Sequence, residues 1–525
     1  MSASVDVLGV FREQLSPDQV TDALAQREFF AQDVYRCGAT PLAVIHPRST
    51  ADVQTVVQLA RVHRIALHVR GGGMSYTDAF LPRQSWSIVM DLGGMRRIRS
   101  FEPHDLLLTA EAGCTWAQIS AELAPHGLRA KFWGPMSGSL ATLGGGMSQG
   151  AATFGSARHG TSAAAVLGFE VVLGTGDVLN TAARGRRSAF FRPFGPDLTG
   201  LFTADAGALG IKTAMTLQLE PVPRVRAALS FAIDEFEALQ RALSEVLHSG
   251  LATEVFGLET RLAQWVAGEQ SLIQDLRALW AVSRAQDGVW NGLRQAWRMA
   301  SAGRGFLARS QYIINILLEG RDATRLALDV RELRAIMHQH GREVANTMAA
   351  VIQSTPFPSP MVVGPGGRRL LPLNIILPHS ALTAFHRDFE AVRERHQAQC
   401  ERLGISLFMV FAGIGPSCVL HEPVLYWKDA WLPLHEATLE PGLRQALQPS
   451  QDNPDARRYV EALRLELIAL MAEHDGAHLQ IGRAYPFLQG RDPAFQGLIA
   501  ELKNKIDPDG LINPGALGLI ADPRA

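Results

Sequence analysis

Short apolar runs alternate with amphipathic stretches over residues 41–223. The stretch 50–63 places Val53, Val56 and Val57 at helical spacing behind a Ser-Thr cap, and the stretch 115–126 predicts a second helix that ends at Gly127. Runs rich in aliphatic residues predict strands at 42–45, 65–69, 88–92, 106–110 and 166–173. This alternation predicts an α/β domain over residues 1–223.

The pattern changes over residues 224–490, where longer helical segments appear. Helices are predicted at 234–249, 258–286 and 322–339, with strands between them at 227–233, 311–318, 371–376 and 407–412. A Pro/Gly-rich stretch at 355–367 predicts an exposed loop. We expect a second domain with an antiparallel sheet flanked by helices. Residues 491–525 add a helix at 493–505 and a turn-rich tail that we expect to pack back on the first domain.

Two glycine-rich segments follow predicted strands in the first domain. The first reads Arg-Gly-Gly-Gly-Met-Ser over 70–75, and the second runs from Gly134 to Gly150. Successive glycines let backbone N–H groups turn toward an anion and let backbone lie flat against a large ligand. The Rossmann spacing GxGxxG is absent from the first segment, so it is a different kind of nucleotide loop or a tight turn.

The order and separation of these segments resemble the FAD-binding domain of the vanillyl-alcohol oxidase / p-cresol methylhydroxylase superfamily. The similarity continues through Arg158–Thr161, the strand 166–173, the segment 197–221 (DLTGLFTADAGALGIKTAMTLQLEP) and the C-terminal 507–515 (DPDGLINPG). The resemblance implies an α+β fold: a PCMH-type FAD-binding domain of two α/β subdomains, and a cap domain over the flavin ring. The middle of the chain resembles the family's cap only in placement and texture.

The resemblance also implies which residues bind FAD. The first loop would hold the pyrophosphate, the second would line the flavin, and a third segment would contact the adenine–ribose half. The implied residues are Arg70, Gly71, Gly72, Gly73, Met74 and Ser75; Pro135, Ser137, Thr142, Gly145 and Ser148; and Gly207, Gly210 and Ile211.

Departures from the family pattern bear on how FAD is held. Met74 stands where some members attach FAD covalently through a histidine, and no cysteine lies between 115 and 399 for the link that others use. We therefore expect non-covalent FAD, although a link through the cap stays open. Ala206 replaces a commonly acidic residue, which puts that contact in doubt.

Residues for the substrate side are expected in the cap domain and just before the C-terminal helix. Arg483 and Tyr485 occupy the place where 4-alkylphenol oxidases of the family carry a Tyr-Arg pair, so Arg483 could stabilise a negative charge and Tyr485 could orient substrate. A second cluster, His421-Glu422 with Tyr426, Trp427 and Lys428, suits an aromatic pocket or a cap surface. Tyr312 is a weaker candidate. The His-x-Gly-Asp-Gly-Asn-type metal ligands of the 2-hydroxyacid dehydrogenases are missing near Gly413–Pro416, so no metal is expected.

Composition restricts partners and location. The chain has 525 residues, a net charge of −1 and four cysteines that form no CxxC pair. This argues against non-specific attraction to nucleic acid or anionic lipid and against a zinc site or disulfide framework. No signal peptide and no transmembrane run is visible. We expect a cytoplasmic enzyme with a small-molecule substrate and an unknown electron acceptor, and the family resemblance suggests that it can form a homodimer.

The sequence predicts an FAD-dependent oxidoreductase that oxidises a phenolic or other small alcohol by hydride transfer to the flavin. Two alternatives stay open: a D-2-hydroxyacid dehydrogenase, and a flavin-bearing transferase of the ether-lipid synthase type without net redox.

Overall fold

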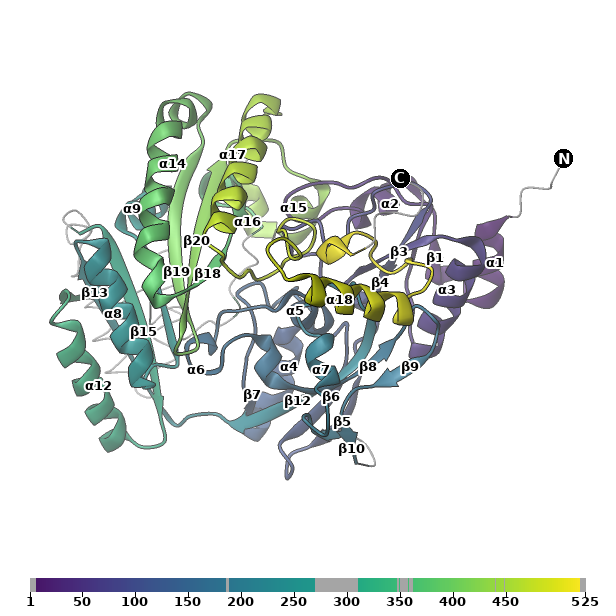
Figure 1. Cartoon of the computed structure of the whole chain (residues 1–525), viewed down its shortest axis with the longest axis horizontal. Coiled ribbons are helices and arrows are strands. Elements are labelled where there is room, and N and C mark those ends of the chain that lie inside the picture. Colours follow the sequence, from purple (N-terminus) through teal and green to yellow (C-terminus); the bar gives the residue numbers. More distant parts are fainter. Residues whose placement is uncertain are drawn as a thin grey trace.

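The structure, a computed structural model, describes residues 6–519 apart from 186–187, 270–309, 347–348, 350–356, 358–361, 440 and 448. Figure 1 shows two lobes, in which the N-terminal half and the yellow C-terminal tail form one domain and the teal and green middle of the chain forms the other. We call the first the N-terminal domain and the second the cap domain.

The N-terminal domain begins with a small sheet in the order β1-β2-β4-β3, in which β2, β4 and β3 are parallel and β1 is antiparallel. Its helix α3 starts behind Ser49, whose hydroxyl accepts the N–H of Asp52 at 3.1 Å. The apolar stripe of that helix is fully buried, as its helical spacing predicts. The elements are α1 (Val7–Gln14), β1 (Val20–Thr21), α2 (Leu24–Phe30), β2 (Ala43–Ile45), α3 (Thr50–His63), β3 (Ala66–Arg70) and β4 (Ser87–Asp91).

A second sheet of the same domain is antiparallel, in the order β5-β6-β12-β8-β9 with β7 paired to β12. The long β12 is its centre, and all but two of its residues before the final Pro221 are buried. The elements are β5 (Ile98–Glu102), β6 (Leu107–Glu111), α4 (Trp116–Leu123), β7 (Leu128–Ala130), α5 (Leu143–Gln149), α6 (Ser156–His159), β8 (Val166–Val172), β9 (Val178–Asn180), β10 (Ala183–Arg184), β11 (Ala189–Phe191), α7 (Leu198–Leu201) and β12 (Ile211–Pro221).

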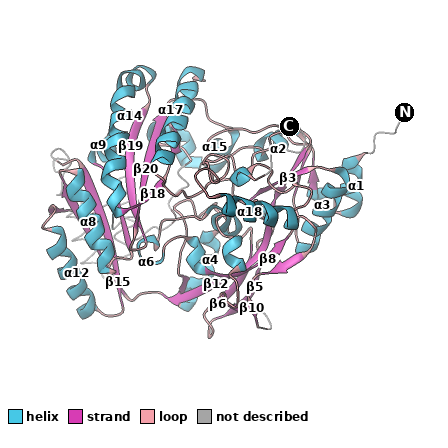
Figure 2. Ribbon diagram, viewed as in Figure 1, coloured by secondary structure: helices cyan, strands magenta, loops and turns pink. Residues whose placement is uncertain are grey.

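The cap domain is one antiparallel sheet in the order β16-β13-β15-β14-β19-β20-β17, with β18 also paired to β20. Helices cover its outer face (Figure 2), and the inner face turns toward the N-terminal domain. The strands are β13 (Val225–Ile233), β14 (Glu254–Glu259), β15 (Tyr312–Gly320), β16 (Arg342–Val344), β17 (Arg369–Pro372), β18 (Ile375–Pro378), β19 (Ser406–Ile414) and β20 (Cys418–Trp427). The helices are α8 (Phe236–Ser249), α9 (Thr260–Glu269), α12 (Ala323–Met337), α14 (Leu382–Leu403), α15 (Pro433–Thr438), α16 (Pro441–Ala446) and α17 (Pro454–Glu473).

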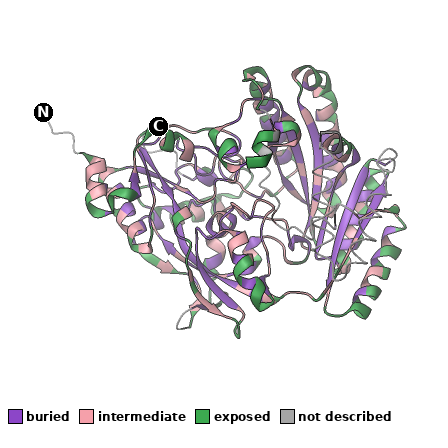
Figure 3. Ribbon diagram, turned by 180° about the vertical axis from the view of Figure 1, so that it is seen from behind, coloured by how far each residue is buried: buried purple, intermediate pink, exposed green. Residues whose placement is uncertain are grey.

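The two faces of the cap sheet differ in burial, and the purple strands in Figure 3 mark the buried core. Side chains on the outer face, such as Phe231, Ile316 and Met409, are fully buried against the helices. On the inner face Phe256, Leu258 and Val410 are only half-buried. The inner face is therefore accessible where it meets the N-terminal domain.

The C-terminal tail returns to the N-terminal domain. After α18 (Pro493–Ile506), Leu67 donates its N–H to Leu511 O at 2.8 Å and accepts from Asn513 N at 2.8 Å. Lys503 and Asp507 form a fully buried ion pair at 2.6 Å that fixes the end of the helix. The tail thus adds a short strand-like segment beside β3.

The fold confirms the predicted α+β class, with differences in the cap domain. The predicted strand 371–376 is two strands, β17 and β18, because the chain bends at Leu373 and Asn374. The predicted helix 258–286 is α9 as far as residue 269, and its remainder and most of the loop 355–367 lie outside the described residues. The sequence reading missed β20, which contains Pro423 in its middle.

Candidate functional site

A pocket lies between the two glycine segments of the N-terminal domain. It encloses about 870 Å³, open solvent at its mouth included, and its walls come from β3 and the loop after it, from the segment 135–151, and from residues 206–212. Gln480 and Asn513 close it from the C-terminal part of the chain.

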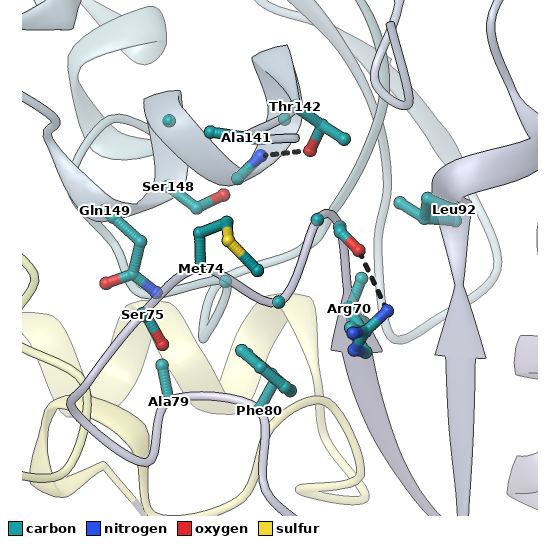
Figure 4. A pocket seen from close by; sticks show the side chains of 18 of the residues that line it. Arg70, Met74, Ser75, Ala79, Phe80, Leu92, Ala141, Thr142, Ser148 and Gln149 are labelled. Carbon is teal, nitrogen blue, oxygen red and sulfur yellow. Dashed lines mark hydrogen bonds between the residues drawn. The ribbon is translucent and has the colours of Figure 1, made fainter. Parts of the chain in front are cut away.

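Arg70 places an under-compensated positive charge beside this pocket. Its guanidinium is buried beside the ring of Phe30, 4.8 Å from the ring centre. The nearest carboxylate is Asp91, 3.8 Å away, and burial lowers the pKa of Arg70. Its Nε has no hydrogen-bond partner, and Nη1 makes only a long bond of 3.4 Å to Gly71 O (Figure 4). A buried cation with spare donors is suited to a phosphate group.

The glycines of the first loop are required by close contacts. A Cβ on Gly71 would lie 2.3 Å from Thr142 Oγ1, and one on Gly72 would lie 2.1 Å from the carbonyl oxygen of Leu140. Gly73 has φ +75°, and a Cβ there would meet the Arg70 guanidinium. The loop can therefore lie against the second segment only without side chains at these positions.

The second segment forms a helix, α5, where an ordered loop was expected. Thr142 caps it, with Oγ1 accepting the N–H of Gly145 at 3.2 Å (Figure 4). Gly144 packs against Ala112 and Gly146 against Trp116, where a Cβ would lie 2.8 Å from the nearest atom in each case. Figure 4 shows Met74 and Ser148 extending into the space between the two segments. The small residues of α5 thus let its backbone form a wall of the pocket.

Asp205 organises the third wall. Its carboxylate is buried, pairs with Lys212 at 2.7 Å and accepts the N–H of Gly207 at 2.9 Å. Asn513 ties this wall to β3, because its Oδ1 accepts Val69 N at 2.8 Å and its Nδ2 reaches Gly207 O at 3.3 Å. Asp205 therefore supports this wall through Lys212 and the backbone of Gly207, while its own side chain does not line the pocket.

The residues present fit a dinucleotide with a pyrophosphate. The pocket offers Arg70 as a cation, Ser75 as a buried hydroxyl without a partner, and Gln149 with a buried Oε1 without a partner. Phe80, Leu92 and Ala79 add apolar wall for ring systems. Polar groups that are buried but unsatisfied within the described residues indicate a ligand that completes them.

A carboxyl group stands on the inner face of the cap sheet. Glu422 belongs to β20 and is half-buried, and its carboxyl group makes no hydrogen bond or ion pair with any residue that the structure describes. Burial raises its pKa to about 7, with no charged group contributing to the shift. Its charge in turn helps raise the pKa values of Tyr76, Tyr426 and Tyr485, so these phenols lie near it.

These tyrosines link Glu422 to the pocket. Tyr76 follows Ser75 directly, and Ser75 lines the pocket. Tyr485 comes five residues after Gln480, another lining residue, and its hydroxyl accepts the N–H of Asn374 at 2.8 Å. Glu422 therefore lies on the inner face of the cap sheet near tyrosines whose neighbours in sequence line the pocket.

Residues 41–182 match the family described as FAD binding domain. The whole chain superposes on p-cresol methylhydroxylase with substrate bound, with a TM-score of 0.72, 17% identity and coverage of 98% of this chain and 96% of that one. The chain carries the FAD-binding domain and the fold of the PCMH-type flavoproteins. A second structure of this fold is alkyldihydroxyacetonephosphate synthase. The superposition covers 97% of this chain and 84% of the synthase chain, with a TM-score of 0.68 and 15% identity.

Curated relatives of this chain include the glycolate oxidase subunit GlcD of Bacillus subtilis, which is 26% identical over 243 residues, 45% of this chain and 50% of that protein. The chain spans about half the length of the curated relatives it matches. No helix within the described ranges is long and apolar enough to cross a membrane. Nor do the described residues bring three or more His, Cys, Asp or Glu side chains together as a metal site.

Most residues implied for FAD binding line this pocket of the N-terminal domain. Thirteen do so: Arg70, Gly71, Gly72, Gly73, Met74, Ser75, Pro135, Ser137, Thr142, Gly145, Ser148, Gly207 and Gly210. Ile211 does not, because its side chain is fully buried in the apolar core behind the pocket. The strand that starts there turns Ile211 inward and Lys212 toward the cavity.

Arg483, predicted to face the substrate, directs its guanidinium to backbone carbonyl groups. Its Nη1 donates to Asp78 O and Leu81 O, both at 2.7 Å, and its Nε and Nη2 donate to Pro514 O at 3.1 and 2.9 Å. The guanidinium therefore joins the loop after β3 to the C-terminal tail. Sequence position alone could not reveal these carbonyl acceptors, which come from distant segments.

Strand geometry separates the cluster of 421–428. His421 and Trp427 point to the outer, helix-covered face, while Glu422 and Tyr426 share the inner face. Tyr312 also belongs to the outer core, with its hydroxyl 3.2 Å from His386 Nε2. Glu422 was not among the predicted catalytic residues. If the alternation of polar and apolar residues had identified β20 as a strand, Glu422 would have been placed with Tyr426 on one face.

Proposed function

We propose that this chain is an FAD-dependent oxidoreductase that oxidises an uncharged alcohol or phenolic compound, with Glu422 accepting the proton of the substrate hydroxyl. The observation that carries the proposal is a half-buried carboxyl group with a pKa of about 7 and without a countercharge, on the inner face of the cap sheet and near tyrosines that flank the pocket in sequence. A base of that pKa is effective near neutral pH.

When bound, FAD supplies the acceptor for a hydride from the substrate carbon. Residues of the chain accept the proton, orient the substrate and hold the cofactor. Glu422 takes the hydroxyl proton, and the phenols of Tyr426 and Tyr485 orient the substrate beside it. Arg70 holds the phosphate groups through its spare donors. The inner face of the cap sheet, with Phe256 and Val410, limits water around the reacting atoms.

Charge favours an uncharged substrate over a 2-hydroxy acid. Burial alone raises the pKa of Glu422, and no described cation contributes to the shift. A substrate carboxylate beside Glu422 would place two like charges in a poorly solvated space. The GlcD relative favours the 2-hydroxy acid alternative and the synthase structure favours the transferase alternative. We regard both as less consistent with this electrostatic environment.

We further propose that FAD is held without a covalent bond. None of the described residues that line the pocket is a histidine, cysteine or tyrosine, the side chains used for such links in the family.

A substrate panel under anaerobic conditions tests the function. Benzyl alcohols and 4-alkylphenols are expected to bleach the flavin absorption at about 450 nm, while D-lactate and glycolate leave it unchanged. Bleaching by the hydroxy acids alone would contradict the substrate class. An adduct spectrum without two-electron reduction, formed with an acyl dihydroxyacetone phosphate, would favour the transferase. Re-exposure to air then separates an oxidase, which recolours at once, from a dehydrogenase.

A further inference from the structure

Tyr485 has a buried hydroxyl group whose hydrogen atom has no acceptor among the described residues. The phenol oxygen accepts the backbone N–H of Asn374 at 2.8 Å and the Nδ2 amide group of the same residue at 3.3 Å. Only 4% of Tyr485 is exposed. A phenol oxygen that already accepts two hydrogen bonds has only its own O–H left for a third group. A buried donor without an acceptor is costly, and the oxygen atom of a ligand would remove that cost.

Asn374 uses all of its polar groups to hold the segment that carries Tyr485. Its Oδ1 accepts the N–H of Leu479 at 2.7 Å, and its Nδ2 also donates to Leu479 O at 3.2 Å. Its backbone carbonyl accepts from Nδ1 of His478 at 2.7 Å. The His478 ring stacks on the phenol ring of Tyr485, with ring centres 4.1 Å apart and planes 10° from parallel. Asn374 therefore fixes both the ring of Tyr485 and the direction of its hydroxyl group.

Asn374 lies opposite Glu422 on the cap sheet. The strand pairs on either side of it, β17 with β20 and β18 with β20, keep one register, which makes Glu422 its partner on β20. Its neighbours Leu373 and Ile375 point to the helix-covered core, so Asn374 shares the inner face with Glu422. Opposed Cβ atoms of antiparallel strands are about 4.5–5.5 Å apart. The hydroxyl group of Tyr485, which Asn374 holds, is therefore close to Glu422.

We propose that Asn374 is a positioning residue, which fixes the Tyr485 hydroxyl group as a hydrogen-bond donor to the oxygen atom of the substrate. This role rests on the proposed function, in which Glu422 accepts the proton of the substrate hydroxyl. The substrate oxygen then donates to Glu422 and accepts from Tyr485, so the site selects a hydroxyl group over a methyl ether or an unsubstituted ring. As the proton passes to Glu422, the Tyr485 donor stabilises the negative charge that develops on the oxygen.

Binding of phenol to the FAD-loaded protein tests this role without turnover, because phenol has a hydroxyl group but no alkyl carbon to oxidise. Isothermal titration calorimetry measures its affinity, and toluene is the matched ligand without an oxygen atom. Tyr485→Phe should weaken phenol binding about tenfold and leave toluene binding unchanged. Tyr459→Phe is the matched control variant, since the Tyr459 hydroxyl contacts His396 of α14 instead.

Variants of Asn374 test whether it acts through Tyr485. Asn374→Asp should weaken phenol binding but not toluene binding, because a carboxylate at this position accepts the phenol hydrogen itself. Adding Asn374→Asp to Tyr485→Phe should weaken phenol binding no further. Asn374→Leu, which has a similar shape and no charge, gives the same test if the aspartate variant does not retain FAD.

The proposal would be overturned by an absence of phenol binding to the wild type, by unchanged phenol binding in Tyr485→Phe, or by additive losses in the double variant. Equal weakening of phenol and toluene in the Asn374 variants would show that Asn374 only supports the fold. The proposed function is tested separately: alcohols that fail to bleach the flavin contradict alcohol oxidation, whereas phenol binding reports on Tyr485 and Asn374 without it.

Discussion

Replacing Glu422 by glutamine should stabilise the protein at alkaline pH. The folded-state pKa of about 7 is above the ordinary value of 4.5. The folded state therefore retains this proton longer than the unfolded state does, and stability falls as pH rises from about 4.5 to about 7. Above pH 7 the folded protein bears the full destabilisation caused by the ionised Glu422. Glutamine keeps the shape without titrating, so the variant escapes this loss.

The size of the effect follows from the two pKa values. Between pH 5 and pH 8 the wild-type protein should lose about 2.5 kcal/mol of unfolding free energy through this group. This loss corresponds to a decrease of about 2–5 °C in melting temperature, the smaller value if the whole chain unfolds as one unit and the larger if one domain does. Because water reaches the half-buried carboxyl group, this is an upper estimate.

Thermal melting followed by tryptophan fluorescence, with saturating FAD, measures the effect. The difference in melting temperature between Glu422→Gln and wild type should grow in favour of the variant from pH 5 to pH 8. Glu466→Gln is a matched control, since Glu466 forms ion pairs at the surface and its pKa is lowered. A difference that stays constant with pH would refute the assignment of a raised pKa to Glu422.

Three further predictions address the pocket and its support. Gly72→Ala should reduce the FAD content of the purified protein at least tenfold, since its Cβ would clash with the Leu140 carbonyl; full flavin occupancy in the variant would show that the loop tolerates a side chain. Acid precipitation should release all yellow colour to the supernatant, whereas colour in the pellet would reveal a covalent link. Arg483→Gln should cost about 2–4 kcal/mol of stability by leaving three carbonyl groups without their donors. Its KM for substrate should not change, and a raised KM at unchanged melting temperature would restore the substrate-facing role.

The sequence identified the cofactor domain because the constraints there are local. Both loops need glycines because their backbones make contacts too close for any side chain, and each loop follows a strand. These local requirements produce the recognisable motifs at 70–75 and 134–150. Helix α3 matches its predicted bounds for the same reason, since its cap and apolar stripe are both local. Ile211 was misassigned because alternation along a strand decides which neighbour faces the cavity.

The substrate side was harder to predict because it is assembled from distant segments. Pro423 and the polar pair His421-Glu422 obscured the alternation of β20, so Glu422 on the inner face was grouped with residues on the outer face. Arg483 looked functional by position, yet carbonyl groups more than 30 residues away in sequence occupy its donors. Tertiary contacts of this kind leave no signal in a single sequence.

The pH dependence of anaerobic flavin reduction tests the central proposal most directly. With a benzyl alcohol or 4-alkylphenol that bleaches the flavin, the wild-type rate should rise through a pKa near 7 as Glu422 ionises. Glu422→Gln should be slower by about 10²–10⁴-fold and should lack that pH dependence. A variant that reduces its flavin at the wild-type rate, with the same pH profile, would contradict the role of Glu422 as the proton acceptor.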